Sequence, residues 1–100
     1  MDSPATSSGL KTSSAVIYDK SCRLQSVQVN TDGTNAATVI VYDSEDTTTS
    51  GRLVLAKFIV PGAQGGDFRH FNDIGIYANR GLYCTISGTG AEAIVAYFPS

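Results

Sequence analysis

The carboxy-terminal stretch 81-GLYCTISGTGAEAIVAYFPS-100 holds two short runs of β-branched and aromatic residues on either side of the turn-forming sequence SGTG at 87–90. Successive side chains of a β-strand point to opposite faces, so the second run divides into two rows. One row consists of Ala91, Ala93, Val95 and Tyr97, and the other of Glu92, Ile94, Ala96 and Phe98. Both rows are largely apolar, although a sheet with one solvated face is apolar on the other face only. We therefore expect one row to fill a core and the other to form a contact surface, and a one-residue shift in register exchanges them.

Two further runs share this two-faced pattern. They are 36-AATVIVYD-43 and 52-RLVLAKFIV-60. A continuous apolar run of this kind is typical of a strand that is covered on both sides. A monomer rarely exposes a contiguous apolar patch larger than a few hundred Å², so we expect a partner subunit to cover the second row of each run. The candidate interface residues are Ile40, Tyr42, Leu53, Leu55, Ile94, Val95, Tyr97 and Phe98.

Short strand-forming runs alternate with clusters of Gly, Asn, Asp and Ser along the chain from residue 14 onward. The remaining runs lie at 15–19, 22–30, 67–71, 74–78 and 81–87. This spacing predicts an all-β fold, an antiparallel β-sandwich or jelly roll of seven to eight strands. Within 22–30 the apolar phase changes at Gln25–Ser26, which predicts a β-bulge. SGTG and the polar stretch at 44–51 are both interpreted as hairpin turns.

A chain of 100 residues predicts one domain. Residues 1–13 are rich in Ser, Thr, Ala and Pro, so we expect a flexible N-terminal arm there and a single sandwich domain over residues 14–100. The N-terminus has no basic start followed by an apolar stretch, which favours a protein made and kept in the cytosol.

Composition narrows the classes of partner. Charged residues make up 16% of the chain, against about 25% in a typical domain, which suggests that part of the surface is covered by something other than water. The net charge of −2 argues against nucleic acid, which needs a basic stripe to neutralise phosphates. No run approaches the length of about 18 apolar residues that a membrane span requires.

Candidate catalytic and metal-binding residues are few. His70 is the one histidine and lies between Asp67 and Asp73, but no nucleophile context accompanies it, so a strand with Phe68 and His70 on one face is the favoured interpretation. Asp43, Glu45 and Asp46 supply oxygens that calcium could use, yet their spacing does not match a known calcium loop. We expect no catalytic site, no cofactor and no metal.

The two cysteines, Cys22 and Cys84, are expected to be small buried hydrophobic residues, while a disulfide between them stays open. The glycine-rich stretch 61-PGAQGGD-67 lacks the Lys-Ser/Thr pair of a phosphate-binding loop. The five tyrosines could line a carbohydrate or protein surface, although strand tyrosines more often lie at a core edge or interface.

The order of these segments resembles small β-sandwich proteins among the structural proteins of tailed bacteriophages. The resemblance rests on a strand ending in Tyr42-Asp43, the stretch 47-TTTSGRLVLAKFIVPGA-63, and the ending 74-IGIYANRGLYCTISGTGAEAIVAYF-98. It covers residues 14–98 and consists mainly of turn and strand residues. It implies a non-enzymatic virion protein that decorates or cements the capsid, and it implies no catalytic residues. The two cysteines and the charged 67-DFRHFND-73 depart from the pattern.

The resemblance implies the major capsid protein or other virion proteins as partners, a homo-oligomer with a trimer favoured, and a location in the virion assembled in the host cytoplasm. Two alternatives stay open: a tail, neck or fibre component of the same particle, and a carbohydrate-binding β-sandwich module. A low charge, strands that are apolar on both faces and a polar N-terminal segment agree with a protein that works through repeated surface contacts.

Overall fold

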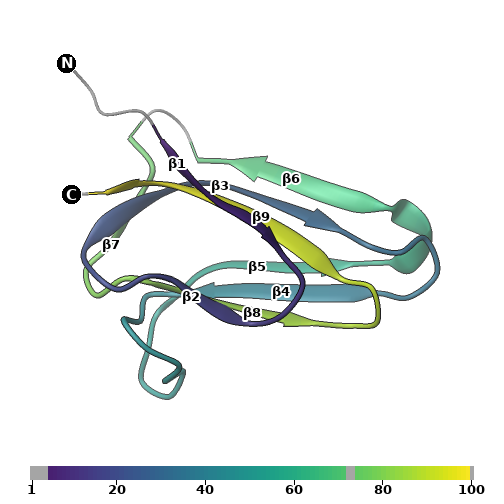
Figure 1. Cartoon of the computed structure of the whole chain (residues 1–100), viewed down its shortest axis with the longest axis horizontal. Helices are drawn as coiled ribbons and strands as arrows, with labels where there is room; N and C mark the ends of the chain where they lie inside the picture. Colours follow the sequence, from purple (N-terminus) through teal and green to yellow (C-terminus); the bar gives the residue numbers. More distant parts are fainter. Residues whose placement is uncertain (1–4, 72–73, 100) are drawn as a thin grey trace.

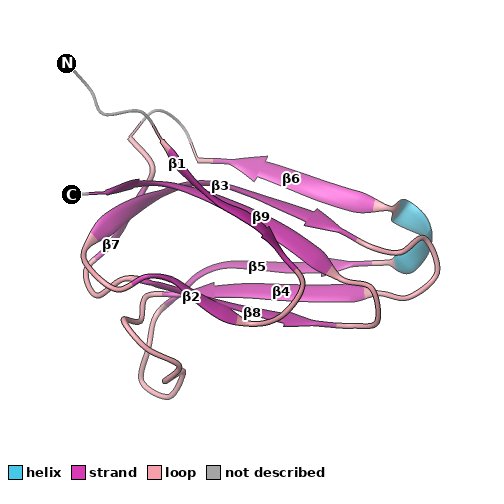
Figure 2. Cartoon of the chain, in the orientation of Figure 1, coloured by secondary structure: helices cyan, strands magenta, loops and turns pink. Residues whose placement is uncertain are grey.

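The computed structural model describes residues 5–71 and 74–99, which form two antiparallel sheets packed face to face (Figure 1). Sheet A contains, in order, β1 (Thr6–Lys11), β9 (Glu92–Pro99), β3 (Cys22–Asn30) and β6 (Gly66–His70), with β7 (Ile76–Ala78) also paired to β3. Sheet B contains β2 (Ala15–Tyr18), β8 (Leu82–Ser87), β4 (Ala37–Tyr42) and β5 (Val54–Val60). The predicted β-sandwich is confirmed, with nine strands in the described residues in place of seven to eight. One short 3₁₀ turn, Gly62–Gln64, follows β5 (Figure 2).

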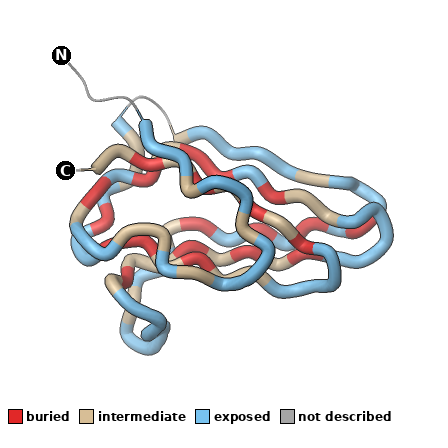
Figure 3. The backbone as a smooth tube through the Cα atoms, in the orientation of Figure 1, coloured by how far each residue is buried: buried red, intermediate tan, exposed pale blue. Residues whose placement is uncertain are grey.

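The core lies between the two sheets and is formed by one row of each long strand (Figure 3). Val27, Val39, Val41 and Val95 are fully buried there, and the residues that alternate with Val39, Val41 and Val95 are only partly buried. This alternation is the period of two that a pleated strand imposes on its side chains. It leaves each sheet with a second, outward face.

The chain crosses repeatedly from one sheet to the other. The strands β4 and β5 pair with each other, which confirms the hairpin predicted around residues 44–51. The SGTG turn is different, because β8 belongs to sheet B and β9 to sheet A. The prediction of a hairpin at SGTG is therefore wrong: its glycines carry the chain across the sandwich, with positive φ at Gly88 and Gly90. Turn chemistry signals a reversal but does not say which sheet the next strand joins.

The predicted irregularity in β3 is confirmed. The pairing of β3 with β9 skips Gln25, since Leu24 is opposite Tyr97 while Ser26 is opposite Ala96. Leu24 and Val27 are three residues apart and would point to opposite faces of a regular strand. Because Gln25 is an extra residue in the pairing, both side chains reach the core.

The N-terminal segment corrects the expectation of a flexible arm over residues 1–13. The strand β1 pairs with the edge of β9, and the hydroxyl oxygen of Ser8 accepts the Val95 backbone N–H at 2.9 Å where the register shifts. Residues 1–4 lie outside the described part of the chain. The side chains of β1 are mostly exposed, so the strand is held by backbone pairing, and its polar sequence carries no apolar pattern that would have predicted it.

Candidate functional site: the outer faces of the sandwich

The structure separates the two rows of the last strand. Val95 is 0% exposed and Tyr97 is also buried, with the Tyr97 ring centroid 5.1 Å from that of Tyr18 inside the sandwich. Ile94 and Phe98 are partly buried on the outer face of sheet A. Of the two alternative pairs, Ile94 and Phe98 are therefore the pair available for contact.

The candidates on β4 and β5 lie on the other side of the molecule. Ile40 and Tyr42 alternate with the buried Val39 and Val41, and so lie on the outer face of sheet B. Leu53 precedes β5 and is 66% exposed. Leu55 packs against the core, because the register of β4 with β5 shifts there and pairs Tyr42 with Val54. The eight candidates thus do not form one surface.

The outer face of sheet B is made of three cross-strand rows, which follow from the register of β2, β8, β4 and β5. Residues directly opposite each other in an antiparallel pair share a face. The rows are Val16–Tyr83–Tyr42–Val54, then Thr85–Ile40–Lys57, then Ser87–Thr38–Ile59. The rings of Tyr42 and Tyr83 stack with centroids 6.4 Å apart. This face consists of aliphatic, aromatic and hydroxyl side chains with Lys57 as the one charged member of the three rows.

The outer face of sheet A has a more polar character. The guanidinium of Arg23 lies 5.2 Å from the Phe98 ring centroid and donates a hydrogen bond to the Ile74 carbonyl at 3.2 Å. Leu10, Ile94 and Phe68 mark a second apolar region, interrupted by Gln28. The Arg23 guanidinium and the Gln28 amide thus lie among the apolar side chains of this face.

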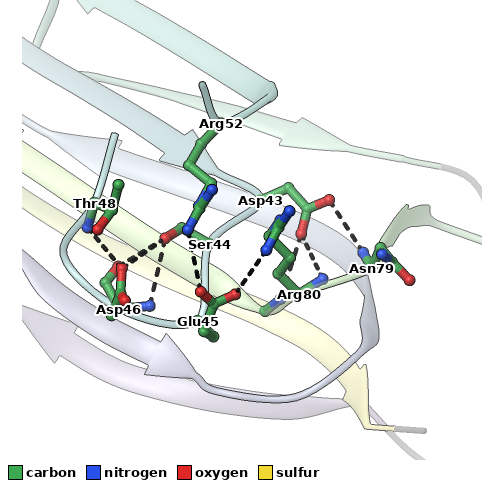
Figure 4. Close-up of polar contacts among 9 residues, drawn as sticks. Asp43, Ser44, Glu45, Asp46, Thr48, Arg52, Asn79 and Arg80 are labelled. Carbon is green, nitrogen blue, oxygen red and sulfur yellow. Dashed lines mark hydrogen bonds and ion pairs between the residues drawn. The ribbon is translucent and has the colours of Figure 1, made fainter. Parts of the chain in front are cut away.

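The acidic loop between β4 and β5 uses its carboxylates to hold itself in place (Figure 4). The Asp43 carboxylate accepts the backbone N–H groups of Asn79, Arg80 and Gly81 at 3.1, 2.7 and 3.3 Å. Glu45 lies between two guanidinium groups, 3.2 Å from Arg52 and 3.6 Å from Arg80. These contacts fasten the loop to the turn between β7 and β8.

Asp46 completes this loop. Its carboxylate accepts the Thr48 backbone N–H at 2.8 Å, and hydrogen bonds from the Thr48 backbone and side chain hold the pKa of Asp46 below its usual value. The hydroxyl of the buried Ser44 donates to the Asp46 carbonyl at 2.9 Å. No group of three or more His, Cys, Asp and Glu side chains suited to a metal ion occurs among residues 5–71 and 74–99.

We expect Asp43→Ala to lower the free energy of unfolding by about 1–3 kcal/mol, because three backbone N–H groups lose their acceptor. Urea unfolding followed by circular dichroism measures this loss. The matched control is Asp19→Ala, since Asp19 is exposed directly after β2. Equal, small losses in both variants would contradict the role given to Asp43.

His70 lies at the end of β6 with its Nε2 atom 2.9 Å from Nε2 of Gln25. The register puts His70 opposite Ser26 and Asp67 opposite Val29, on the two different faces of β6. Phe68 shares the face of His70 and Arg69 points the other way, over the Phe58 ring, which confirms the strand interpretation of this segment. Asp73, the other acidic neighbour considered for His70, lies outside the described residues.

Cys22 and Cys84 are buried free thiols, on β3 in sheet A and β8 in sheet B. Burial raises the pKa of Cys22 to about 11, with a smaller contribution from the Asp43 carboxylate, and burial raises the pKa of Cys84 to about 12. The expectation that both cysteines are buried is confirmed. Such thiols stay protonated and unreactive at neutral pH.

These two pKa values give a pH dependence. The thiol ionises at a lower pH in the unfolded chain, near 9.0, than in the folded protein. Stability from the two thiols is therefore complete below pH 9 and is lost as the pH rises toward 11 to 12. We expect the urea midpoint of the protein to fall as the pH rises above about 9. The Cys84→Ala variant should show a smaller fall, when its midpoint at each pH is compared with its own midpoint at pH 7. We also expect thiol reagents to label the cysteines rapidly only after unfolding. Full labelling of the native protein at pH 8 would contradict this account.

The fold defines the chain as a two-sheet antiparallel β-sandwich protein. Comparisons with protein families, with curated proteins and with solved structures each find no match. Among the described residues, no helix has the length and apolar character needed to cross a membrane.

Proposed function

We propose that this protein is a non-enzymatic structural subunit of a bacteriophage virion, and in the first place a capsid decoration protein that stabilises the head as a symmetric oligomer. The observation that carries the proposal is the outer face of sheet B, which presents apolar, aromatic and hydroxyl side chains with one charged member in its three rows. The virion setting rests on the resemblance of residues 14–98 to small β-sandwich proteins of tailed phages.

The arrangement of the polar groups supports a structural role. Asp43, Glu45 and Asp46 are engaged in holding the loop and the neighbouring turn, and the two thiols are buried and protonated. Faces with few charged side chains favour many weak contacts that symmetry repeats over a particle, where avidity adds to the affinity of one contact. The partner expected on this proposal is the major capsid protein or another virion protein.

A binding assay on particles tests the proposal. Purified protein is mixed with heads of the encoding phage that lack it, and the mixture is separated on a density gradient. We expect the protein to sediment with the heads at a fixed, saturable ratio and to raise the temperature at which they open. Absence from the heads combined with binding on a glycan array would overturn the proposal in favour of a carbohydrate-binding module, and exclusive binding to purified tails would move the site to the tail.

A further inference from the structure

We infer that the outer face of sheet B binds a second copy of this chain face to face, about a two-fold axis that runs along the strands between β8 and β4. This inference assigns the face that carries the proposed function to the contact between copies within the symmetric oligomer, and it does not depend on the virion setting. Its evidence is the chemical symmetry of the first of the three rows across the sheet.

The first row across sheet B is palindromic. It consists, from edge to edge, of Val16 on β2, Tyr83 on β8, Tyr42 on β4 and Val54 on β5. A two-fold axis in the plane of contact and parallel to the strands places β5 of one copy over β2 of the other. Val54 then meets Val16 of the second copy, and Tyr42 meets Tyr83. A two-fold interface requires a surface complementary to itself, and a Val-Tyr-Tyr-Val row meets that requirement.

The charge on this face agrees with the same axis. Lys57 lies on β5, at one edge of the sheet, in the row with Ile40 and Thr85. Because the axis exchanges the two edges, the Lys57 ammonium groups of the two copies lie at opposite margins of the contact. They are separated by roughly 14 Å, which exceeds the screening length of about 8 Å at physiological salt. The Lys57 ammonium groups therefore stay at the rim of the contact, where water reaches them.

The size of the face sets the strength of the association. The four strands lie about 4.8 Å apart, and six residues along a strand span about 3.3 Å each. The projected area of the face is therefore about 400 Å². A stable standard interface buries about 800 Å² per partner. The contact is therefore reversible and depends on concentration, and symmetric assembly on a larger particle would strengthen it.

The loop between β4 and β5 extends past the strand ends on the side of the molecule away from sheet A (Figure 1). Under a two-fold axis along the strands, the loops of both copies lie at the same end of the contact. The Glu45 carboxylate and the Arg52 and Arg80 guanidinium groups hold this loop in shape. The loop thus limits the contact at one end, next to the Val-Tyr-Tyr-Val row.

Charge substitutions at the two valines test the inference. Both positions lie on edge strands and are partly open to solvent, Val16 at 39% and Val54 at 47%. We expect Val16→Glu alone and Val54→Lys alone each to weaken association about tenfold or more, because each leaves an uncompensated charge in an apolar contact. A chain carrying both substitutions is expected to regain association, since a carboxylate then faces an ammonium across the axis at both ends of the row. Within one chain the two positions are about three strand spacings, or 14 Å, apart, so the rescue comes from the partner.

Sedimentation equilibrium over concentrations from about 10 µM to about 1 mM measures the association of each variant. Phe68→Lys is the matched control, because Phe68 is 57% exposed on the outer face of sheet A and should leave association unchanged. A monomer mass for the unmodified chain at every concentration overturns the inference, as does a trimer mass. A dimer that ignores both single substitutions, or a double variant weaker than both, also overturns it. Head binding with a strictly monomeric chain would leave the proposed function standing while the inference fails.

Discussion

Val95→Asp is expected to abolish folding, whereas Ile94→Asp, one residue away on the same strand, leaves a folded protein. Val95 is 0% exposed on the core side of β9, and Ile94 lies on the outer face of sheet A. An unpaired carboxylate in the core costs several kcal/mol, a large share of the roughly 5–15 kcal/mol that stabilises a domain of this size. At Ile94 the same carboxylate stays in contact with water. Far-UV circular dichroism and urea unfolding of the two variants measure the difference.

The pair of substitutions also tests the register of the strand. A one-residue slip of β9 would exchange the two rows and reverse the result, so that Ile94→Asp unfolds the protein and Val95→Asp does not. Equal effects at both positions would mean that both rows are buried in the monomer. The first outcome would put Val95 on the outward face in place of Ile94, and the second would leave this strand without an outward face.

Gly88→Ala is expected to destabilise the protein by about 3 kcal/mol or more, and Gly33→Ala by about 1 kcal/mol. Both glycines have positive φ, +112° at Gly88 and +91° at Gly33. A Cβ atom at Gly88 would lie 2.2 Å from the Ala36 carbonyl oxygen, while a Cβ at Gly33 meets nothing within 4 Å. The comparison therefore separates the cost of backbone conformation from the cost of the clash.

The urea midpoints of the two glycine variants measure these losses. We expect the slope of the free energy of unfolding against urea concentration to stay unchanged. The larger loss at Gly88 reflects the path of the chain, since the turn after β8 passes close to the residue before β4 as it crosses to sheet A. Equal losses of about 1 kcal/mol would show that the turn has room for a methyl group, and would contradict this close approach.

Much of the strand content could be predicted from the sequence because the apolar runs have the period of a pleated strand. The run at 22–30 matches β3, and the phase change at Gln25–Ser26 marks its bulge. The SGTG prediction was wrong because a glycine turn fits both a hairpin and a crossing between sheets. Whether the chain turns back or crosses depends on which distant strands are available for pairing. Here β9 pairs with β1 and β3, so the chain crosses to sheet A.

The strand β1 could not be predicted from the sequence. Nothing in TSSGLK signals a strand, and these residues form one because they pair with β9.

The candidate surface could be predicted in part. Ile40 and Tyr42 are outward residues as expected, but the row that Tyr42 joins needs Val16 and Tyr83 from strands far apart in sequence. Register, which the sequence alone does not give, brings these residues together.

We propose that this protein binds a second copy of itself through the outer face of sheet B, and not through that of sheet A. The most direct measurement is a dilution series of isotope-labelled protein followed by nuclear magnetic resonance. We expect the signals of Val16, Tyr42, Val54 and Tyr83 to shift together as the concentration rises, while those of Leu10 and Phe68 on sheet A stay in place. Shifts confined to sheet A, or spectra that do not change with concentration, would contradict it.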